Sequence, residues 1–163
     1  MASRESTYRV LFVCTGNTCR SPMAAAALEG ALESERERVE VQSAGTAARD
    51  GQPATAATIA VCRRQGIDLA GHASRRVTPA LLAAADLVLV MERDHLRTVL
   101  GMGADPRKTH VLSEWPEPGE PGLPVSDPFG ASPEAYEECW RRIRHHVERV
   151  VPQVREALRA RSA

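Results

Sequence analysis

The chain lacks net charge, because 21 basic side chains balance 21 acidic ones along its 163 residues. A chain of this kind has no global field that would draw in nucleic acid or an anionic membrane surface. The sequence therefore argues against both partners, and any anion that binds must do so at a local site.

Long apolar runs are also missing, since no stretch approaches the roughly 20 residues that span a membrane. Residues 1–7 lack the apolar centre of a secretory signal peptide. We therefore expect a cytoplasmic protein. Cysteine is sparse, and in the cytoplasm we expect the four residues to be thiols rather than disulfides. Their spacing matches no usual zinc pattern, so neither a metal nor another cofactor is predicted.

The length fits one domain, which we expect over residues 8–158 with loose tails at 1–7 and 159–163. Short apolar and β-branched runs predict strands at about 8–13, 39–43, 86–90 and 108–112. Helices are predicted at about 22–35, 53–65, 79–84, 92–100 and from 133 onward, with Pro152 kinking or interrupting the last one. This alternation indicates an α/β fold with a parallel sheet. The proline-rich stretch 114–130 is predicted to be a constrained, functional loop.

The segment Cys14–Pro22, with the sequence Cys-Thr-Gly-Asn-Thr-Cys-Arg-Ser-Pro, joins the first strand to the first helix. Ser21 is a favourable N-cap and Pro22 a favourable first helical residue. A tight loop in this place directs backbone N–H groups and the positive end of the helix at one point. The segment therefore predicts an anion site.

Cys14 and Arg20 open and close this loop, with five residues between them. Arg20 can direct two donors at a tetrahedral oxyanion. Cys14 lies where amides, the helix end and Arg20 all favour the thiolate, so we expect a lowered pKa and a nucleophile for phosphoryl transfer. Each residue alone is as readily a buried strand-end Cys or a surface Arg, and their combination with Gly16 and Asn17 favours the site.

The segment resembles the signature loop of the low-molecular-weight protein tyrosine phosphatase family, and its Asn17-Thr18-Cys19 variant is most similar to the protein-arginine phosphatase branch. The resemblance extends from about residue 9 to 158 and includes Ser43-Ala44-Gly45, the run 85–91 and Asp127-Pro128-Phe129-Gly130. It implies a four-stranded parallel sheet of order 2-1-3-4 with helices on both faces. It also implies phosphorylated proteins as substrates, with phosphate or a similar oxyanion in the loop.

Asp127 is the candidate general acid, because the leaving group of a phosphoryl transfer needs a proton. It precedes Pro128, and this pair resembles the Asp-Pro motif that carries the acid in the family. The alternative is that Asp127 forms an Asx-turn or caps the last helix.

The remaining loop residues line or support the proposed cradle. Thr15, Gly16, Asn17, Thr18, Cys19 and Ser21 are candidates for substrate binding, together with Phe129. Ser21 can donate to the Cys14 sulfur, and Asn17 can adopt a left-handed conformation that turns amides inward. The resemblance implies that His72 bonds Asn17, although His72 is as readily a surface residue. No role is predicted for His95, His110, His145 or His146.

Cys19 has two interpretations that the sequence leaves open. It is either a small filler beneath the loop or a resolving thiol that captures oxidised Cys14 in a reversible disulfide, which the family resemblance supports.

Thr18 bears on the substrate, because the matching residue of tyrosine-specific relatives is usually aliphatic. The stretch 46–49 has no aromatic residue, and Phe129-Gly130 stands where those relatives often carry two tyrosines. These features favour phosphoarginine, whereas the aromatic wall at Phe129 keeps phosphotyrosine as the alternative.

Three other classes of protein are less favoured. A non-catalytic phosphate-binding module would lack Cys14, Arg20 or Asp127. An arsenate reductase on the same fold needs further cysteines near the site, and residues 66–85 contain none. A nucleotide-binding P-loop needs Lys before Ser or Thr, where this chain has Arg20 before Ser21.

Overall fold

The computed structural model describes residues 7–117 and 124–162. Its centre is a parallel sheet of four strands in the order β2-β1-β3-β4. The strands are β1 (Tyr8–Cys14), β2 (Val39–Gly45), β3 (Leu87–Val90) and β4 (Thr109–Val111). The predicted strands and their predicted order are both confirmed.

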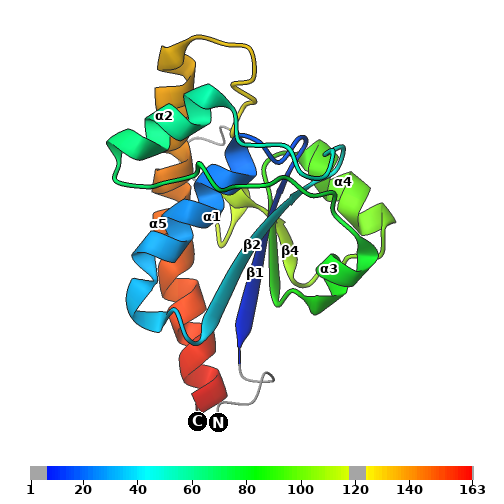
Figure 1. The fold of residues 1–163 in the computed structure, drawn as a ribbon. Helices are drawn as coiled ribbons and strands as arrows, with labels where there is room; N and C mark the ends of the chain where they lie inside the picture. Colours follow the sequence, from blue (N-terminus) through cyan, green and yellow to red (C-terminus); the bar gives the residue numbers. More distant parts are fainter. Residues whose placement is uncertain (1–6, 118–123, 163) are drawn as a thin grey trace.

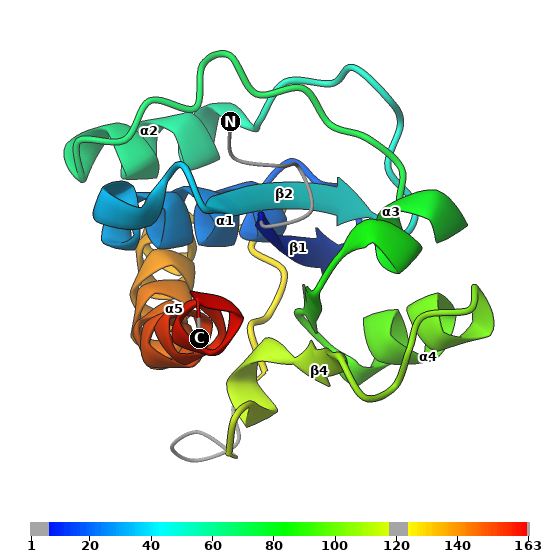
Figure 2. The ribbon, with the colours of Figure 1, turned by 90° about the horizontal axis from the view of Figure 1, so that it is seen from below.

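Helices cover both faces of the sheet (Figures 1 and 2). One side carries α1 (Arg20–Ala31) and α5 (Pro133–Ser162), with α2 (Ala56–Arg64) packed beside them. The other side carries α3 (Pro79–Ala84) and α4 (Arg93–Gly101). The predicted helices on both faces are therefore present.

The alternation of side chains along β1 explains why the sheet is covered twice. Val10 and Phe12 join the core beneath α1 and α5, whereas Leu11 and Val13 join the core beneath α3 and α4. All four side chains are fully buried, as in parallel strands that lie between two helical layers. Because β1 has β2 on one side and β3 on the other, its carboxyl end lies where the strand order switches. This is the usual place for a ligand in such sheets.

The first helix begins at Arg20, so the predicted N-cap at Ser21 is wrong. Ser21 lies in the first turn, and its hydroxyl bonds groups of the preceding loop instead of capping the helix. The helix also ends at Ala31 rather than Glu35. The caps expected for the later helices are present, since Thr78 accepts from the Leu81 N–H at 3.1 Å and Ser132 accepts from the Ala135 N–H at 3.3 Å.

The last helix differs from the prediction in two ways. It runs through Pro152 without interruption, because Val150, Val154 and other buried side chains on both sides hold it in the core. It also continues to Ser162, so the tail predicted from residue 159 is helical up to that point. Arg161 pairs with Asp86 at 2.6 Å and anchors this end to the start of β3.

Two predictions fall partly outside the described residues, namely the loose tail at 1–6 and the part of the proline-rich loop at 118–123. Within residues 7–117 and 124–162, no helix is both long and apolar enough to cross a bilayer.

Candidate active site

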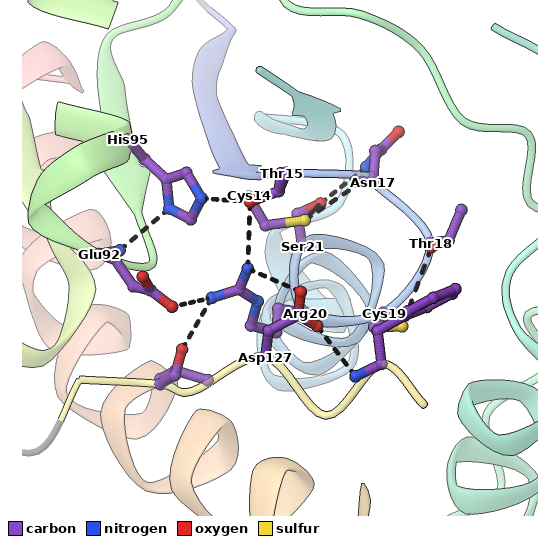
Figure 3. Close-up of polar contacts among 12 residues, drawn as sticks. Cys14, Thr15, Asn17, Thr18, Cys19, Arg20, Ser21, Glu92, His95 and Asp127 are labelled. Carbon is purple, nitrogen blue, oxygen red and sulfur yellow. Dashed lines mark hydrogen bonds and ion pairs between the residues drawn. The ribbon is translucent and has the colours of Figure 1, made fainter. Parts of the chain in front are cut away.

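The loop after β1 curls around one point at the carboxyl edge of the sheet (Figure 3). Asn17 has a φ of 57°, which confirms the predicted left-handed conformation. Its side chain donates to Ser21 Oγ at 2.7 Å and to Ser43 Oγ at 2.9 Å, and it accepts from the Arg75 N–H at 2.9 Å. The buried Asn17 thus ties the loop to α1, to β2 and to the segment before α3.

His72 also contacts the loop at Asn17. Its Nε2 lies 2.7 Å from the backbone carbonyl oxygen of Asn17. The contact with Asn17 that the resemblance implied is therefore present, and it is made to the main chain rather than to the amide side chain. This bond supports the turn at its left-handed residue.

Cys14 ends β1 with its side chain buried beneath the loop. Ser21 Oγ lies 2.9 Å from Cys14 Sγ, and the Asn17 N–H donates to this sulfur at 3.3 Å. Burial raises the pKa of the Cys14 thiol, whereas Ser21, the Arg20 charge and the Asn17 N–H lower it by less. The expected lowered pKa is therefore wrong, because desolvation outweighs the contacts that stabilise the thiolate.

Arg20 is almost fully buried and makes contacts at both ends of its guanidinium group. Nη1 donates to Glu92 Oε1 at 2.5 Å and to the Val125 carbonyl oxygen at 3.0 Å. Nη2 donates to Thr15 Oγ1 at 3.4 Å and lies 3.7 Å from Asp127 Oδ2. The cradle, the end of β3 and the loop before α5 therefore meet at this one side chain.

Glu92 and His95 belong to this site and were not predicted. Glu92 follows directly after Met91 at the end of the apolar β3 run. Its place at the carboxyl end of a strand next to β1 was a signal that the sequence carried. His95 lies in the first turn of α4, and its ring nitrogens bond the Glu92 N–H at 3.1 Å and Thr15 Oγ1 at 2.8 Å. Burial, followed by the Arg20 charge, lowers the pKa of His95 and favours the neutral ring.

Asp127 lies across the pocket from the cradle, in the irregular segment between Pro124 and α5. Its Oδ1 accepts from the Phe129 N–H at 3.0 Å, which is the Asx-turn that the sequence left open. Its Oδ2 faces Arg20 Nη2. The turn and a place in the site are therefore compatible, because the turn orients the carboxyl group.

A pocket of about 210 Å³ lies between these groups. It is lined by Cys14, Thr15, Gly16, Thr18, Cys19, Arg20, Asp127 and Phe129. Phe129 is 70% exposed and forms an aromatic wall at the mouth. The structure thus brings together the three predicted catalytic residues, and Asn17, Ser21 and His72 support the loop from behind.

Cys19 is buried beside polar groups that the sequence did not reveal. Its Sγ lies 3.6 Å from Thr55 Oγ1, 3.7 Å from Tyr136 OH and 3.9 Å from Thr18 Oγ1. Cys14, Cys19, Cys62 and Cys139 are all free thiols, as expected. A resolving role for Cys19 stays a prediction.

Comparisons with known proteins agree on one family. The model of the low molecular weight phosphotyrosine protein phosphatases matches residues 9–161. A protein-arginine-phosphatase of Geobacillus stearothermophilus is 37% identical over 152 residues, covering 93% of this chain and 96% of the relative. A low molecular weight protein-tyrosine-phosphatase of Streptomyces coelicolor is 34% identical over 165 residues, covering 96% of this chain and 99% of the relative.

A solved structure gives the same result for the fold. The YwlE arginine phosphatase, in a mutant with a phosphorylated active-site serine, superposes with a TM-score of 0.82 at 32% identity. The match covers 90% of this chain and 95% of that one.

Proposed function

Because the chain belongs to the low molecular weight phosphotyrosine protein phosphatase family, it is a protein phosphatase, and we propose that it acts through a cysteinyl-phosphate intermediate. The observation that carries this proposal is the shared pocket of Cys14, Arg20 and Asp127. A nucleophile, an anion-binding guanidinium group and an acid line one cavity. The phosphorylated serine in the related arginine phosphatase supports a covalent step in this family.

In the first step, the Cys14 thiol gives its proton to an oxygen of the incoming phosphoryl group, and the resulting thiolate attacks phosphorus. The Ser21 hydroxyl and the Asn17 N–H lie at the sulfur and stabilise its negative charge. Arg20 and the loop amides stabilise the charge that develops on the phosphoryl oxygens. Since these donors are held by the fold before substrate binds, little reorganisation is needed.

Asp127 handles the protons of both steps. Its carboxyl group protonates the leaving atom during the attack by Cys14 and then removes a proton from the water that hydrolyses the cysteinyl-phosphate. The Asx-turn with Phe129 holds the carboxyl group at the pocket, and its half-exposed position gives that water access.

We propose phosphoarginine side chains in proteins as the substrate. Thr18 places a polar side chain in the pocket wall, where its hydroxyl can meet a guanidinium group or the attacking water. Phosphotyrosine is the second candidate, because the exposed ring of Phe129 stands at the mouth and can stack on a phenol. Relatives named for each activity are about equally similar to this chain, so the choice between the two substrates rests on the pocket residues.

The test compares hydrolysis of phosphoarginine and phosphotyrosine peptides by the wild-type protein and by Thr18→Ile. We expect the wild type to prefer phosphoarginine, and we expect Thr18→Ile to shift kcat/KM toward phosphotyrosine by about tenfold, the effect of one polar contact. Preference for phosphotyrosine, together with no effect of Thr18→Ile, would contradict the phosphoarginine proposal.

Cys14→Ser tests the mechanism in the same assay. We expect turnover to be lost while inorganic phosphate still binds, because the amides and Arg20 remain. Turnover of Cys14→Ser at the wild-type rate would contradict a cysteinyl-phosphate intermediate.

A further inference from the structure

The Thr15 hydroxyl contacts two side chains from outside its own loop turn, those of His95 and Arg20. Its Oγ1 lies 2.8 Å from Nε2 of His95, which belongs to α4, and 3.4 Å from Arg20 Nη2. Figure 3 shows the Thr15 side chain between the imidazole ring and the guanidinium group. The same residue lines the pocket beside Cys14.

The tautomer of His95 follows from its second contact. The Glu92 N–H at 3.1 Å can only donate, so His95 Nδ1 is an acceptor and carries no proton. The neutral ring therefore holds its proton on Nε2 and donates it to Thr15 Oγ1. Arg20, Glu92, Asp94 and Asp127 are the charged groups that act on this ring.

The hydrogen bonds of Thr15 can then be counted. A hydroxyl has two acceptor lone pairs and one hydrogen. His95 Nε2–H and Arg20 Nη2–H occupy both lone pairs. The hydroxyl hydrogen is left to donate elsewhere, and an oxyanion bound by Arg20 in the same pocket can accept it.

We propose that the Thr15 hydroxyl donates a hydrogen bond to an oxygen of the phosphoryl group in the cradle, and that His95 is the positioning residue that directs it. This inference rests on the proposed function of the pocket. His95 reaches the pocket through Thr15, whereas its other bond, from the Glu92 N–H, caps the start of α4. The side chain of the first loop residue thus adds a donor to those of the amides and Arg20.

The first test measures inorganic phosphate as a competitive inhibitor of the wild type, Thr15→Val and Thr15→Ser. Valine keeps the shape and the backbone amide but removes the hydroxyl, and serine keeps the hydroxyl. We expect Thr15→Val to raise the inhibition constant about tenfold, as for one bond to a charged group, and Thr15→Ser to stay within about threefold of the wild type. Equal phosphate affinity in Thr15→Val and the wild type would overturn the proposal.

The second test is a double-mutant cycle with His95→Leu. We expect this change to weaken phosphate binding about fivefold in the wild-type background and not at all in Thr15→Val, because the coupling runs through the hydroxyl. His95→Gln, which can still accept and donate, should restore most of the affinity. An equal loss in both backgrounds would mean that His95 acts only through the structure of α4, which overturns its positioning role.

The proposed function is judged by a different result. If the wild type fails to hydrolyse phosphorylated peptides, the phosphatase proposal fails. The phosphate affinities of the Thr15 variants, measured directly by calorimetry, still decide whether the hydroxyl binds the oxyanion.

Discussion

The carboxylate of Glu92 is the negative charge closest to the Arg20 guanidinium group among the described residues. This carboxylate binds Nη1 at 2.5 Å, and the Val125 carbonyl binds the same nitrogen at 3.0 Å. That end of the guanidinium group is thus occupied by the protein, which fixes the plane in which the other end meets a substrate. Arg20 is buried and Glu92 is only partly exposed, so solvent screens this pair less than the surface pairs of the chain.

We therefore predict that Glu92→Gln lowers kcat/KM about tenfold, since a neutral amide holds the cation less firmly than a carboxylate. Glu114→Gln is the matched control, because Glu114 pairs with Arg93, whose side chain is 75% exposed. Pairs of this kind contribute little. Steady-state kinetics on a phosphorylated peptide would measure both, and equal rates for the two variants would contradict a positioning role for Glu92.

At the scale of elements, the end of β2 packs directly against the cradle. A Cβ atom on Gly45 would lie 2.4 Å from the Thr15 carbonyl oxygen and 3.0 Å from the Asn17 nitrogen. Both neighbours are main-chain atoms of the loop, so they cannot move without displacing the amides that we propose as donors to the phosphoryl group. Close approach of two backbones, rather than an unusual φ, requires glycine here.

Gly45→Ala should therefore destabilise the protein by about 2 kcal/mol and weaken phosphate binding, since overpacking displaces backbone. Gly30→Ala provides the contrast, because a Cβ there meets nothing within 4 Å and the residue lies inside α1. It should raise stability by about 0.5–1 kcal/mol through helix propensity alone. Denaturant unfolding measures both, and a Gly45→Ala protein as stable as the wild type would refute the close contact.

At the scale of the whole molecule, burial sets how stability responds to acid. His146 is buried on α5, and its pKa is lowered to about 4 by burial and then by the charges of His145, Arg149 and Arg142. In the unfolded chain the same group titrates near 6.5. Between these values the unfolded state binds a proton that the folded state does not, so stability falls as the pH falls.

We predict that the free energy of unfolding drops by up to about 1.4 kcal/mol per pH unit from this group between about pH 6.5 and 4. His146→Leu should remove the part of the pH dependence of stability that His146 contributes. His145 is exposed, and His145→Gln should keep most of that dependence. Urea unfolding at a series of pH values measures the difference. Parallel stability curves for the wild type and His146→Leu would contradict the prediction, because they would mean that His146 takes up its proton equally in the folded and unfolded states.

The sequence predicted most of the elements because each depends on short-range patterns. The run Asp86–Met91 is apolar enough to mark a strand buried on both faces, and Thr78 and Ser132 mark helix starts before proline. Where prediction failed, a longer-range contact decided the outcome. Ser21 leaves its capping role for Asn17 and Cys14, and core packing carries α5 past Pro152.

The sequence by itself was enough to single out Cys14 and Arg20 at the two ends of the loop after β1, and Asp127 in the segment before α5, because the pattern around each of them lies in one contiguous segment. Only the tertiary structure decided what surrounds them. Glu92 and His95 reach the site because parallel strands end at one edge of the sheet, and Tyr136 reaches Cys19 from the last helix. The raised pKa of Cys14 has the same origin, since burial is a property of the packed molecule and not of its neighbours in the chain.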